Sequence, residues 1–269
     1  MILQNIILVV FVFWALILIV STTASIQKKI HQCFGGINDY EFFEELQIAD
    51  TYGELPRNGL QIIGRGETYD TALYFTSCLH VEDKIKIEAL SRCVQENIVE
   101  NFEERAFGEF GGYGGNNVTY LSGLFPIFLP SIWEKMLALV HTSLIESKWR
   151  KEGINGLSAR CIEFLSYSTN GYLGAHKDAD STFTIVFMLS ELNEYAGGDV
   201  LIATSPTTAD LLREGSYRRL KLEPLSMIIF ESERVHAVDE LINGTRNVLV
   251  VEFWPFPESG VGDKRPSLD

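Results

Sequence analysis

The chain has 269 residues, of which 46% are hydrophobic, so it is long enough for one well-packed domain with appendages. Its 36 acidic and 22 basic side chains give a net charge of −14 at pH 7. Binding to a nucleic-acid backbone depends on Lys and Arg, so this charge argues against a nucleic-acid partner and permits a basic peptide or protein. An acidic surface that only keeps the protein soluble is the simpler explanation.

The N-terminal segment is a run of 15 consecutive apolar residues, Ile6 to Val20. It is short for a membrane span and at the upper end for a signal-peptide core, and extending it to residue 24 gives enough length to span. A buried core helix is the structural alternative. Lys28 and Lys29 follow it, which favours an anchor with a cytosolic C-terminus, whereas the Thr-Thr-Ala of residues 22–24 resembles a cleavage site. We predict a membrane anchor or signal segment at 1–26, and a location in the membrane or lumen of the secretory pathway (endoplasmic reticulum or Golgi).

The cysteines and the glycosylation acceptors do not decide whether the protein lies in an oxidising, lumenal compartment. The four cysteines, at positions 33, 78, 93 and 161, lack the C-x-x-C spacing of zinc and redox motifs. Their even number permits disulfides in a lumenal protein, and buried thiols are an equal alternative. Asn117 and Asn243 begin N-x-T acceptors for glycosylation, but the second also fits an Asn-Gly turn between strands, which we favour.

The region from residue 26 to residue 80 shows no clear period and fits a stalk followed by strands. From Val81 to Phe107 the pattern is helical, because apolar residues recur at intervals of three and four. These residues are Ile87, Leu90, Val94, Ile98 and Phe102. The glycine-dense segment 108–117 predicts a loop, and it lacks the lysine and the strand-to-helix context of a phosphate-binding loop.

A second helix is expected to begin after Pro130, where Ser131 and Glu134 match a capping box. One apolar face then runs to about Trp149 and predicts core packing. Its members are Ile132, Met136, Leu139, Val140 and Leu144.

Beyond residue 159 the chain consists of short β-type runs separated by turn residues. The predicted strands are 161–167, 183–189, 200–203, 227–230 and 248–253. Many short strands at this spacing indicate a barrel or sandwich, and helices that precede them indicate packing on one face of that β core. The sequence therefore predicts an α+β fold.

Three side chains in this β region have the chemistry of a metal site. His176 and Asp178 lie two residues apart, so in an extended segment they point the same way. His236 follows a predicted strand that could deliver it to the same ion. Two histidines and one carboxylate bind one face of Fe(II) and leave the opposite face open. For either histidine alone, a hydrogen-bonded structural role is the alternative.

Arg246 adds an anion site to this interpretation. The Asn-Gly at 243–244 predicts a hairpin that would place His236 and Arg246 on adjacent strands, both facing inward. An arginine offers a fork of donors that matches a carboxylate. A surface salt bridge is the alternative for Arg246.

Four segments around these residues resemble the Fe(II)/2-oxoglutarate oxygenases, especially the catalytic domains of prolyl 4-hydroxylases and lysyl hydroxylases. They are 167–184 (YSTNGYLGAHKDADSTFT), 194–199 (EYAGGD), 226–230 (SMIIF) with His236, and 244–251 (GTRNVLVV). The resemblance covers about residues 110–255 and is strongest from 160 onward. Its combined spacing is specific for the superfamily and much less specific for the substrate.

The resemblance implies a double-stranded β-helix, or jelly-roll, core in which His176, Asp178 and His236 bind Fe(II). Arg246 would pair with the distal carboxylate of 2-oxoglutarate. Tyr167 is a further candidate for positioning this co-substrate, and Thr184 a weaker one. The family's second co-substrate-binding tyrosine falls at position 188, where this chain has Met, so the co-substrate contacts differ. Oxygen would be the second co-substrate, and ascorbate would keep the iron reduced.

The predicted activity is hydroxylation of a peptidyl proline or lysine, with succinate and CO2 as co-products. A basic or proline-rich peptide would be the partner. The alternatives are an oxygenase acting on a small molecule and a non-catalytic jelly-roll binding module. The expected organisation is an anchor or signal at 1–26, a helical or stalk region at 27–109, the oxygenase domain at 110–257 and a loose tail at 258–269. Substrate, disulfide pairing and oligomeric state stay open.

Overall fold

The computed structural model describes residues 60–63, 72–98, 101–105, 113–147, 157–178, 181–204 and 216–255. The predicted anchor or signal, most of the predicted stalk, and the C-terminal tail lie outside these residues. None of the described helices combines the length and the apolar character needed to cross a membrane.

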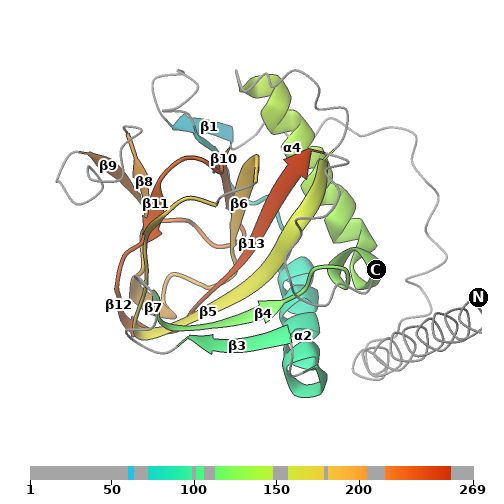
Figure 1. Cartoon of the computed structure of the whole chain (residues 1–269), viewed down its shortest axis with the longest axis vertical. Helices are drawn as coiled ribbons and strands as arrows, with labels where there is room; N and C mark the ends of the chain where they lie inside the picture. The colour runs from blue at the N-terminus through green and yellow to red at the C-terminus, as the bar shows by residue number, and fades with distance from the viewer. Residues whose placement is uncertain are drawn as a thin grey trace, which may run out of the picture.

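The described residues form an antiparallel sheet of 11 strands that curls on itself into a half-barrel (Figure 1). The strand order is β1 (Leu60–Ile63), β2 (Ala72–Phe75), β10 (Met227–Glu231), β6 (Phe183–Met188), β13 (Arg246–Pro255), β5 (Leu157–His176), β11 (His236–Val238), β8 (Val200–Ala203) and β9 (Tyr217–Leu220). Outside this path, β4 (Tyr113–Tyr120) pairs with β5 and with β3 (Phe102–Arg105). A separate pair joins β12 (Leu241–Gly244) to β7 (Tyr195–Gly197).

Strand β5, with 20 residues, belongs to both sides of the half-barrel. Its first half pairs with β13 and its second half with β11, while β4 follows its other edge. The bend lies near Asn170, which has a φ of 65°. A Cβ atom on Gly171 would lie 2.5 Å from the carbonyl oxygen of Gly115, so the close approach of β4 and β5 at this bend requires glycine.

The alternation of side chains along β6 and β13 divides the interior into two cores. Ile185 and Phe187, with Leu249 and Val251, face an outer core between the sheet and the helices. The intervening residues of the same strands face the inside of the half-barrel, where the apolar ones belong to a second core. The polar side chains that line the site share this inner face.

Two long helices cover the outer face of the larger part of the sheet (Figure 1). They are α2 (Val81–Asn97) and α4 (Pro130–Glu146), and the short α3 (Phe125–Phe128) precedes α4. Trp133 of α4 stacks on Phe253 of β13, with ring centroids 5.7 Å apart. The predicted fold class is confirmed: an α+β double-stranded β-helix with helices packed on one face.

The first predicted helix was wrong beyond residue 97. Phe102, expected on its apolar face, begins β3 instead. The Asn97 carboxamide donates to the Cys93 carbonyl at 2.9 Å and so competes for a helical acceptor. Asn101 donates to the Tyr120 carbonyl at 2.9 Å and ties the chain to β4. The Asn97 side chain and the contact of Asn101 with β4 therefore end the helix, although the spacing of apolar residues predicted that it would continue.

The glycine-rich loop predicted at 108–117 was wrong for residues 113–117, which belong to β4. The remaining residues, 108–112, lie outside the described part of the chain. The β4–β5 register shifts between Gly114 and Asn116, so the glycines lie at a bulge where two backbones approach closely.

Helix α4 was predicted correctly, but its capping box was wrong. Leu129 occupies the N-cap and Pro130 the first turn, so Ser131 falls inside the helix. A comparable cap is found on α2 instead, where the Asp83 carboxylate accepts from the backbone N–H of His80 at 2.9 Å. The predicted apolar face of α4 is buried at Ile132, Met136, Leu139 and Val140.

The five strands predicted after residue 159 all occur, in β5, β6, β8, β10 and β13, and β6 ends at Met188, one residue before the predicted end. Strands β1 and β2, which fit the predicted strands after the stalk, join the same sheet through β10. The four-segment division of the chain stays a prediction.

Candidate metal centre

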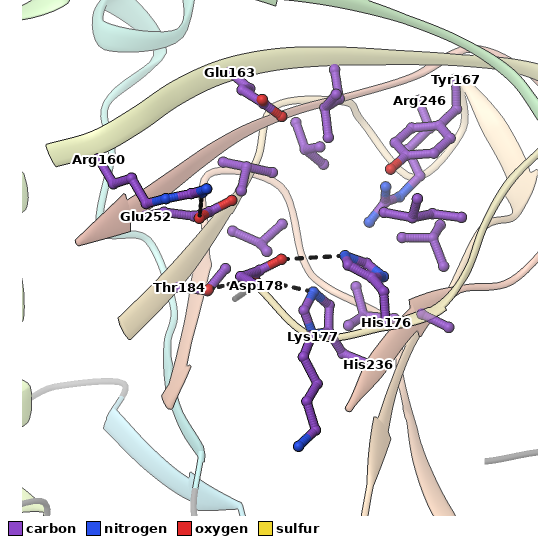
Figure 2. A pocket seen from close by; sticks show the side chains of 18 residues that line it. Arg160, Glu163, Tyr167, His176, Lys177, Asp178, Thr184, His236, Arg246 and Glu252 are labelled. Carbon is purple, nitrogen blue, oxygen red and sulfur yellow. Dashed lines mark hydrogen bonds and ion pairs between the residues drawn. The ribbon is translucent and has the colours of Figure 1, made fainter. Parts of the chain in front are cut away.

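Three side chains converge inside the half-barrel: His176, Asp178 and His236. Their ligand atoms all lie within 4.8 Å of one another. His176 ends β5 and His236 begins β11, and the two residues are direct cross-strand partners. Nε2 of His176 lies 3.3 Å from Oδ1 of Asp178, and Nε2 of His236 lies 3.5 Å from Oδ2 (Figure 2). One carboxylate thus faces two imidazoles, as a facial metal site requires.

Backbone carbonyls set the orientation of both imidazoles. Nδ1 of His176 lies 2.9 Å from the Gly174 carbonyl oxygen, and Nδ1 of His236 lies 3.0 Å from that of Arg234. A carbonyl oxygen only accepts, so each Nδ1 carries the proton and each Nε2 presents a lone pair. Both lone pairs are directed toward Asp178, which is the protonation pattern that a divalent metal ion needs.

Hydrogen bonds also hold Asp178 in place. Its backbone N–H donates to the Ser232 carbonyl at 3.1 Å. The hydroxyl of Thr184 donates to Oδ2 of Asp178 and lies 2.9 Å from the hydroxyl of Ser232. Thr184, predicted as a candidate co-substrate contact, therefore orients a metal ligand, and its contact with 2-oxoglutarate stays a prediction.

The protonation states favour a cation in this centre. Burial lowers the pKa of His236 to about 4, so this imidazole is neutral at pH 7. Burial disfavours the charged form of Asp178, but His236 and His176 outweigh it and lower its pKa to about 2. Against the effect of its own burial, Asp178 raises the pKa of His176. A carboxylate and two imidazoles are the donor set of non-haem iron sites.

Replacing Asp178 by alanine should remove metal binding and leave the fold intact. The substitution deletes one donor of a preformed set and leaves the two histidines on their strands. We expect Fe(II) or Mn(II) affinity to fall by at least about a hundredfold, with an unchanged melting temperature of the metal-free protein. Calorimetric titration and thermal unfolding measure the two quantities. Wild-type metal affinity in this variant would exclude the assigned centre.

Metal affinity should depend on pH through His176. Its raised pKa means that the metal-free protein holds a proton on this imidazole below that pKa, and the metal must displace it. Mn(II) affinity should therefore fall about tenfold per pH unit below the pKa of His176 and level off above it. Titrations between pH 5.5 and 8.5 measure this, and an affinity that is constant over the range would contradict the assignment.

The metal centre opens into a cavity of about 240 Å3 whose wall includes Tyr167 and Arg246 (Figure 2). This volume is below the ~300–1,000 Å3 of drug-sized ligand sites and suits a small organic acid. Arg246, which begins β13, is fully buried. None of its three guanidinium nitrogens makes a hydrogen bond of good geometry, and the hydroxyl of Tyr195 is a polar group that acts on it. A buried, unpaired guanidinium beside a metal centre is the complement of a carboxylate ligand.

Tyrosines surround this guanidinium. Its central carbon lies 5.4 Å from the centroid of the Tyr167 ring. Burial lowers the pKa of Arg246, and nearby Tyr167 and Tyr195 oppose that shift. The hydroxyl of Tyr195 is 3.8 Å from Sδ of Met188, the position at which the sequence resemblance implied a second co-substrate tyrosine. Tyr195 therefore places a phenol near Arg246 from a different strand, which sequence reasoning missed.

The hairpin predicted between His236 and Arg246 was wrong. Strand β12, which contains Asn243 and Gly244, pairs with β7 and separates β11 from β13. His236 and Arg246 instead lie on two strands that both pair with β5, opposite His176 and Tyr167 respectively. Strand β5 is therefore the element that brings them to one cavity.

Gly198 makes room for Arg246, a role that sequence reasoning missed. This glycine has a φ of +66°, and a Cβ atom on it would lie 2.9 Å from Cδ of Arg246 and 2.8 Å from Cδ1 of Leu241. The second glycine of the Glu194–Asp199 segment therefore has a steric function. The sequence offered one signal for this role: Gly198 lies directly before Asp199, in a segment that resembles the double-glycine hairpin of the oxygenases.

Gly198→Ala should weaken carboxylate binding selectively. The added methyl group displaces the Arg246 side chain, so 2-oxoglutarate affinity of the Mn(II)-loaded protein should fall roughly tenfold with unchanged Mn(II) affinity. Gly197→Ala is the control for backbone strain, since Gly197 has a similar φ of +79° and a Cβ atom on it would meet the Glu240 carbonyl oxygen, at 2.4 Å, instead of Arg246. Equal losses of 2-oxoglutarate affinity in both variants would point to backbone strain and contradict this role.

The end of the cavity beyond Asp178 is also charged. Nη1 of Arg160 lies 2.6 Å from Oε2 of Glu252 (Figure 2). The same Oε2 accepts from the Ser181 hydroxyl at 2.5 Å. Burial and the charge of Asp178 raise the pKa of Glu252. Glu163 lines the same end. The metal centre thus lies between the Arg246 end of the cavity and an end that holds the Arg160–Glu252 ion pair and Glu163.

The fold and the centre together define a jelly-roll protein with two histidines and an aspartate as candidate metal ligands, which is the arrangement that the sequence resemblance implied. No protein-family model matches the chain. Among curated proteins it is similar to a PKHD-type hydroxylase of Rippkaea orientalis (strain PCC 8801 / RF-1), with 28% identity over 131 residues. The match covers 45% of this chain and 54% of the relative, so the chain spans about half the length of that relative.

Solved structures show the same fold. SnoN, a non-heme alpha ketoglutarate dependent epimerase from nogalamycin biosynthesis, matches 74% of this chain and 91% of its own, with a TM-score of 0.51 and 13% identity. A Pseudomonas putida prolyl-4-hydroxylase matches 68% of this chain and 92% of its own, with a TM-score of 0.46 and 14% identity. The predicted resemblance is confirmed by the similarity to the curated hydroxylase, and the likeness to SnoN confirms the fold.

Proposed function

We propose that this protein is an Fe(II)/2-oxoglutarate-dependent dioxygenase. The observation that carries the proposal is the pairing, in one cavity, of three metal-ligand side chains with a buried guanidinium that has no hydrogen-bond partner. A structural metal site would not need the guanidinium, and a simple anion site would not need the two oriented histidines. An enzyme that uses a metal ion and a dicarboxylate together needs both.

Each residue has a distinct role in this proposal. His176, Asp178 and His236 hold Fe(II) from one side, and the neutral imidazoles keep their Nε2 lone pairs available without losing a proton from Nδ1. Arg246 binds the distal carboxylate of 2-oxoglutarate with its fork of donors, and Tyr167 flanks that end. When bound, Fe(II) and 2-oxoglutarate supply the activation of O2, with succinate and CO2 as co-products.

The apolar lining of the cavity has a role of its own. Val186, Val200, Val248 and Val250 line it between the two charged ends. These side chains exclude water around the carboxylate and the metal, which strengthens the ionic contacts of Arg246. The buried position of Arg246 also penalises an empty site, since its guanidinium nitrogens make no hydrogen bond of good geometry within the described residues.

The proposed substrate is a peptidyl proline, with lysine as the second choice. The sequence segments resemble prolyl and lysyl hydroxylases, and the curated relative is named a hydroxylase. The net charge of −14 suits a basic peptide. Oxidation of a small molecule is the competing proposal, and a binding module without turnover is the other. Substrate-dependent turnover separates these three proposals.

The test is succinate release by the purified full chain with Fe(II), 2-oxoglutarate and ascorbate. We expect iron-dependent succinate that His236→Ala abolishes. Arg246→Ala should chiefly raise the 2-oxoglutarate concentration that turnover requires. The binding free energy of 2-oxoglutarate should weaken by about 2–5 kcal/mol, because the substitution removes one partner of a buried ion pair. Omitting ascorbate tests the proposal that ascorbate keeps the iron reduced. If it does, succinate release without ascorbate should stop early.

Three outcomes of this assay separate the proposals. Proline-rich or lysine-containing peptides that accelerate succinate release support the peptide hydroxylase. Slow, peptide-independent release directs the search to small molecules. No succinate together with no 2-oxoglutarate binding contradicts the oxygenase and leaves the binding module.

We also propose a secretory-pathway location with membrane attachment through the N-terminal segment. The apolar run of residues 6–20 supports it, and so does Cys93, which is disulfide-bonded, whereas Cys78 and Cys161 are free thiols. Alkylation of the protein in cells, with and without reductant, measures the state of Cys93. Full alkylation of Cys93 without reductant would argue for a reducing compartment.

A further inference from the structure

One buried polar side chain inside the half-barrel has no partner and no role in the site described so far. Asn116 of β4 is 1% exposed. Its Nδ2 and Oδ1 atoms both lack a hydrogen-bond partner. Buried carboxamides are almost always hydrogen-bonded, because leaving a donor and an acceptor unmade is costly. An unsatisfied pair of this kind calls for a ligand or a bound water.

The register of three strands places Asn116 beside the anion-binding end of the cavity. Asn116 on β4 is the direct partner of Tyr167 on β5, and Tyr167 is the direct partner of Arg246 on β13. Directly opposed residues of antiparallel strands project to the same face. Tyr167 and Arg246 line the cavity, so Asn116 projects toward the same interior.

The neighbours of Asn116 confirm this direction. Val118, two residues further along β4, pairs with Leu165, and both belong to the inner core with Tyr167. Neighbouring strands lie ~4.8 Å apart, so the backbones of Asn116 and Arg246 are separated by roughly 10 Å with Tyr167 between them. The bulge between Gly114 and Asn116 lies next to this row, where a bulge re-aims a side chain.

We propose that Asn116 is a co-substrate-positioning residue that completes the polar row Asn116–Tyr167–Arg246. Its Nδ2 donates a hydrogen bond to the dicarboxylate that Arg246 binds, and its Oδ1 accepts from an ordered water. A carboxylate oxygen accepts more than one hydrogen bond, so a guanidinium and a carboxamide can serve the same ligand. This inference rests on the proposed function, because it takes 2-oxoglutarate as the ligand.

The experiment compares Asn116→Leu with Asn117→Leu in the full chain, made without glycosylation and loaded with Mn(II) under argon. Asn117 lies on the opposite face of β4 and is a matched control for the size and polarity change. For Asn116→Leu we expect a 2-oxoglutarate affinity weaker by about ten- to a hundredfold, the loss of one hydrogen bond to a charged group. Mn(II) affinity should be unchanged, and the melting temperature of the ligand-free protein unchanged or higher.

The readouts separate a positioning role from a structural one. A structural asparagine would give a lower melting temperature in Asn116→Leu and leave the 2-oxoglutarate affinity unchanged. Wild-type 2-oxoglutarate affinity in Asn116→Leu therefore overturns the inference while the proposed function stands. A wild-type protein that binds Mn(II) but no 2-oxoglutarate overturns both.

Asn116→Asp keeps the test decisive if the leucine variant does not fold. This isosteric change puts a carboxylate beside the bound anion, so 2-oxoglutarate affinity should fall by about a hundredfold or more. The same variant should bind Mn(II) as the wild type does. An aspartate variant with wild-type 2-oxoglutarate affinity would overturn the inference.

Discussion

The backbone pairing of strand β5 is the constraint on which the site depends. Its first half pairs with β13 and its second half with β11, so one continuous strand carries Tyr167 into register with Arg246 and His176 into register with His236. The distance between the anion-binding end and the metal centre is therefore set by covalent geometry along β5. Side-chain flexibility contributes little to it, because Arg246 and His236 are both buried.

The two cores divide the tasks of stability and function along the same strands. On β6 and β13 every second residue packs against α2 and α4, and the intervening residues face the cavity. Helix packing fixes the strands from outside, so Thr184, Arg246 and Glu252 can be placed inside without contributing apolar burial. The inside of the half-barrel is therefore partly polar, and the buried polar groups without hydrogen-bond partners include Arg246 and Asn116.

The sequence predicted the residues of the candidate metal centre better than it predicted the strands and loops that hold them. His176 and Asp178 were recognisable because an extended strand places positions i and i+2 on one side, and β8 was predicted to its ends, Val200–Ala203. Phe102 and residues 113–117 were misassigned because long-range pairing to β4 and β5 overrides local composition. Gly198 and Asn116 could not be assigned a role, since each depends on a contact with a distant strand.

Both metal-facing histidines are anchored in the same way, each Nδ1 on the carbonyl of the residue two positions earlier. This repetition makes the donor set rigid before any ion arrives. A rigid set of two imidazoles and one carboxylate follows the general affinity order of divalent ions, in which Co2+, Ni2+ and Cu2+ exceed Fe2+. The proposed iron centre is consequently expected to bind these competing ions in solution as well.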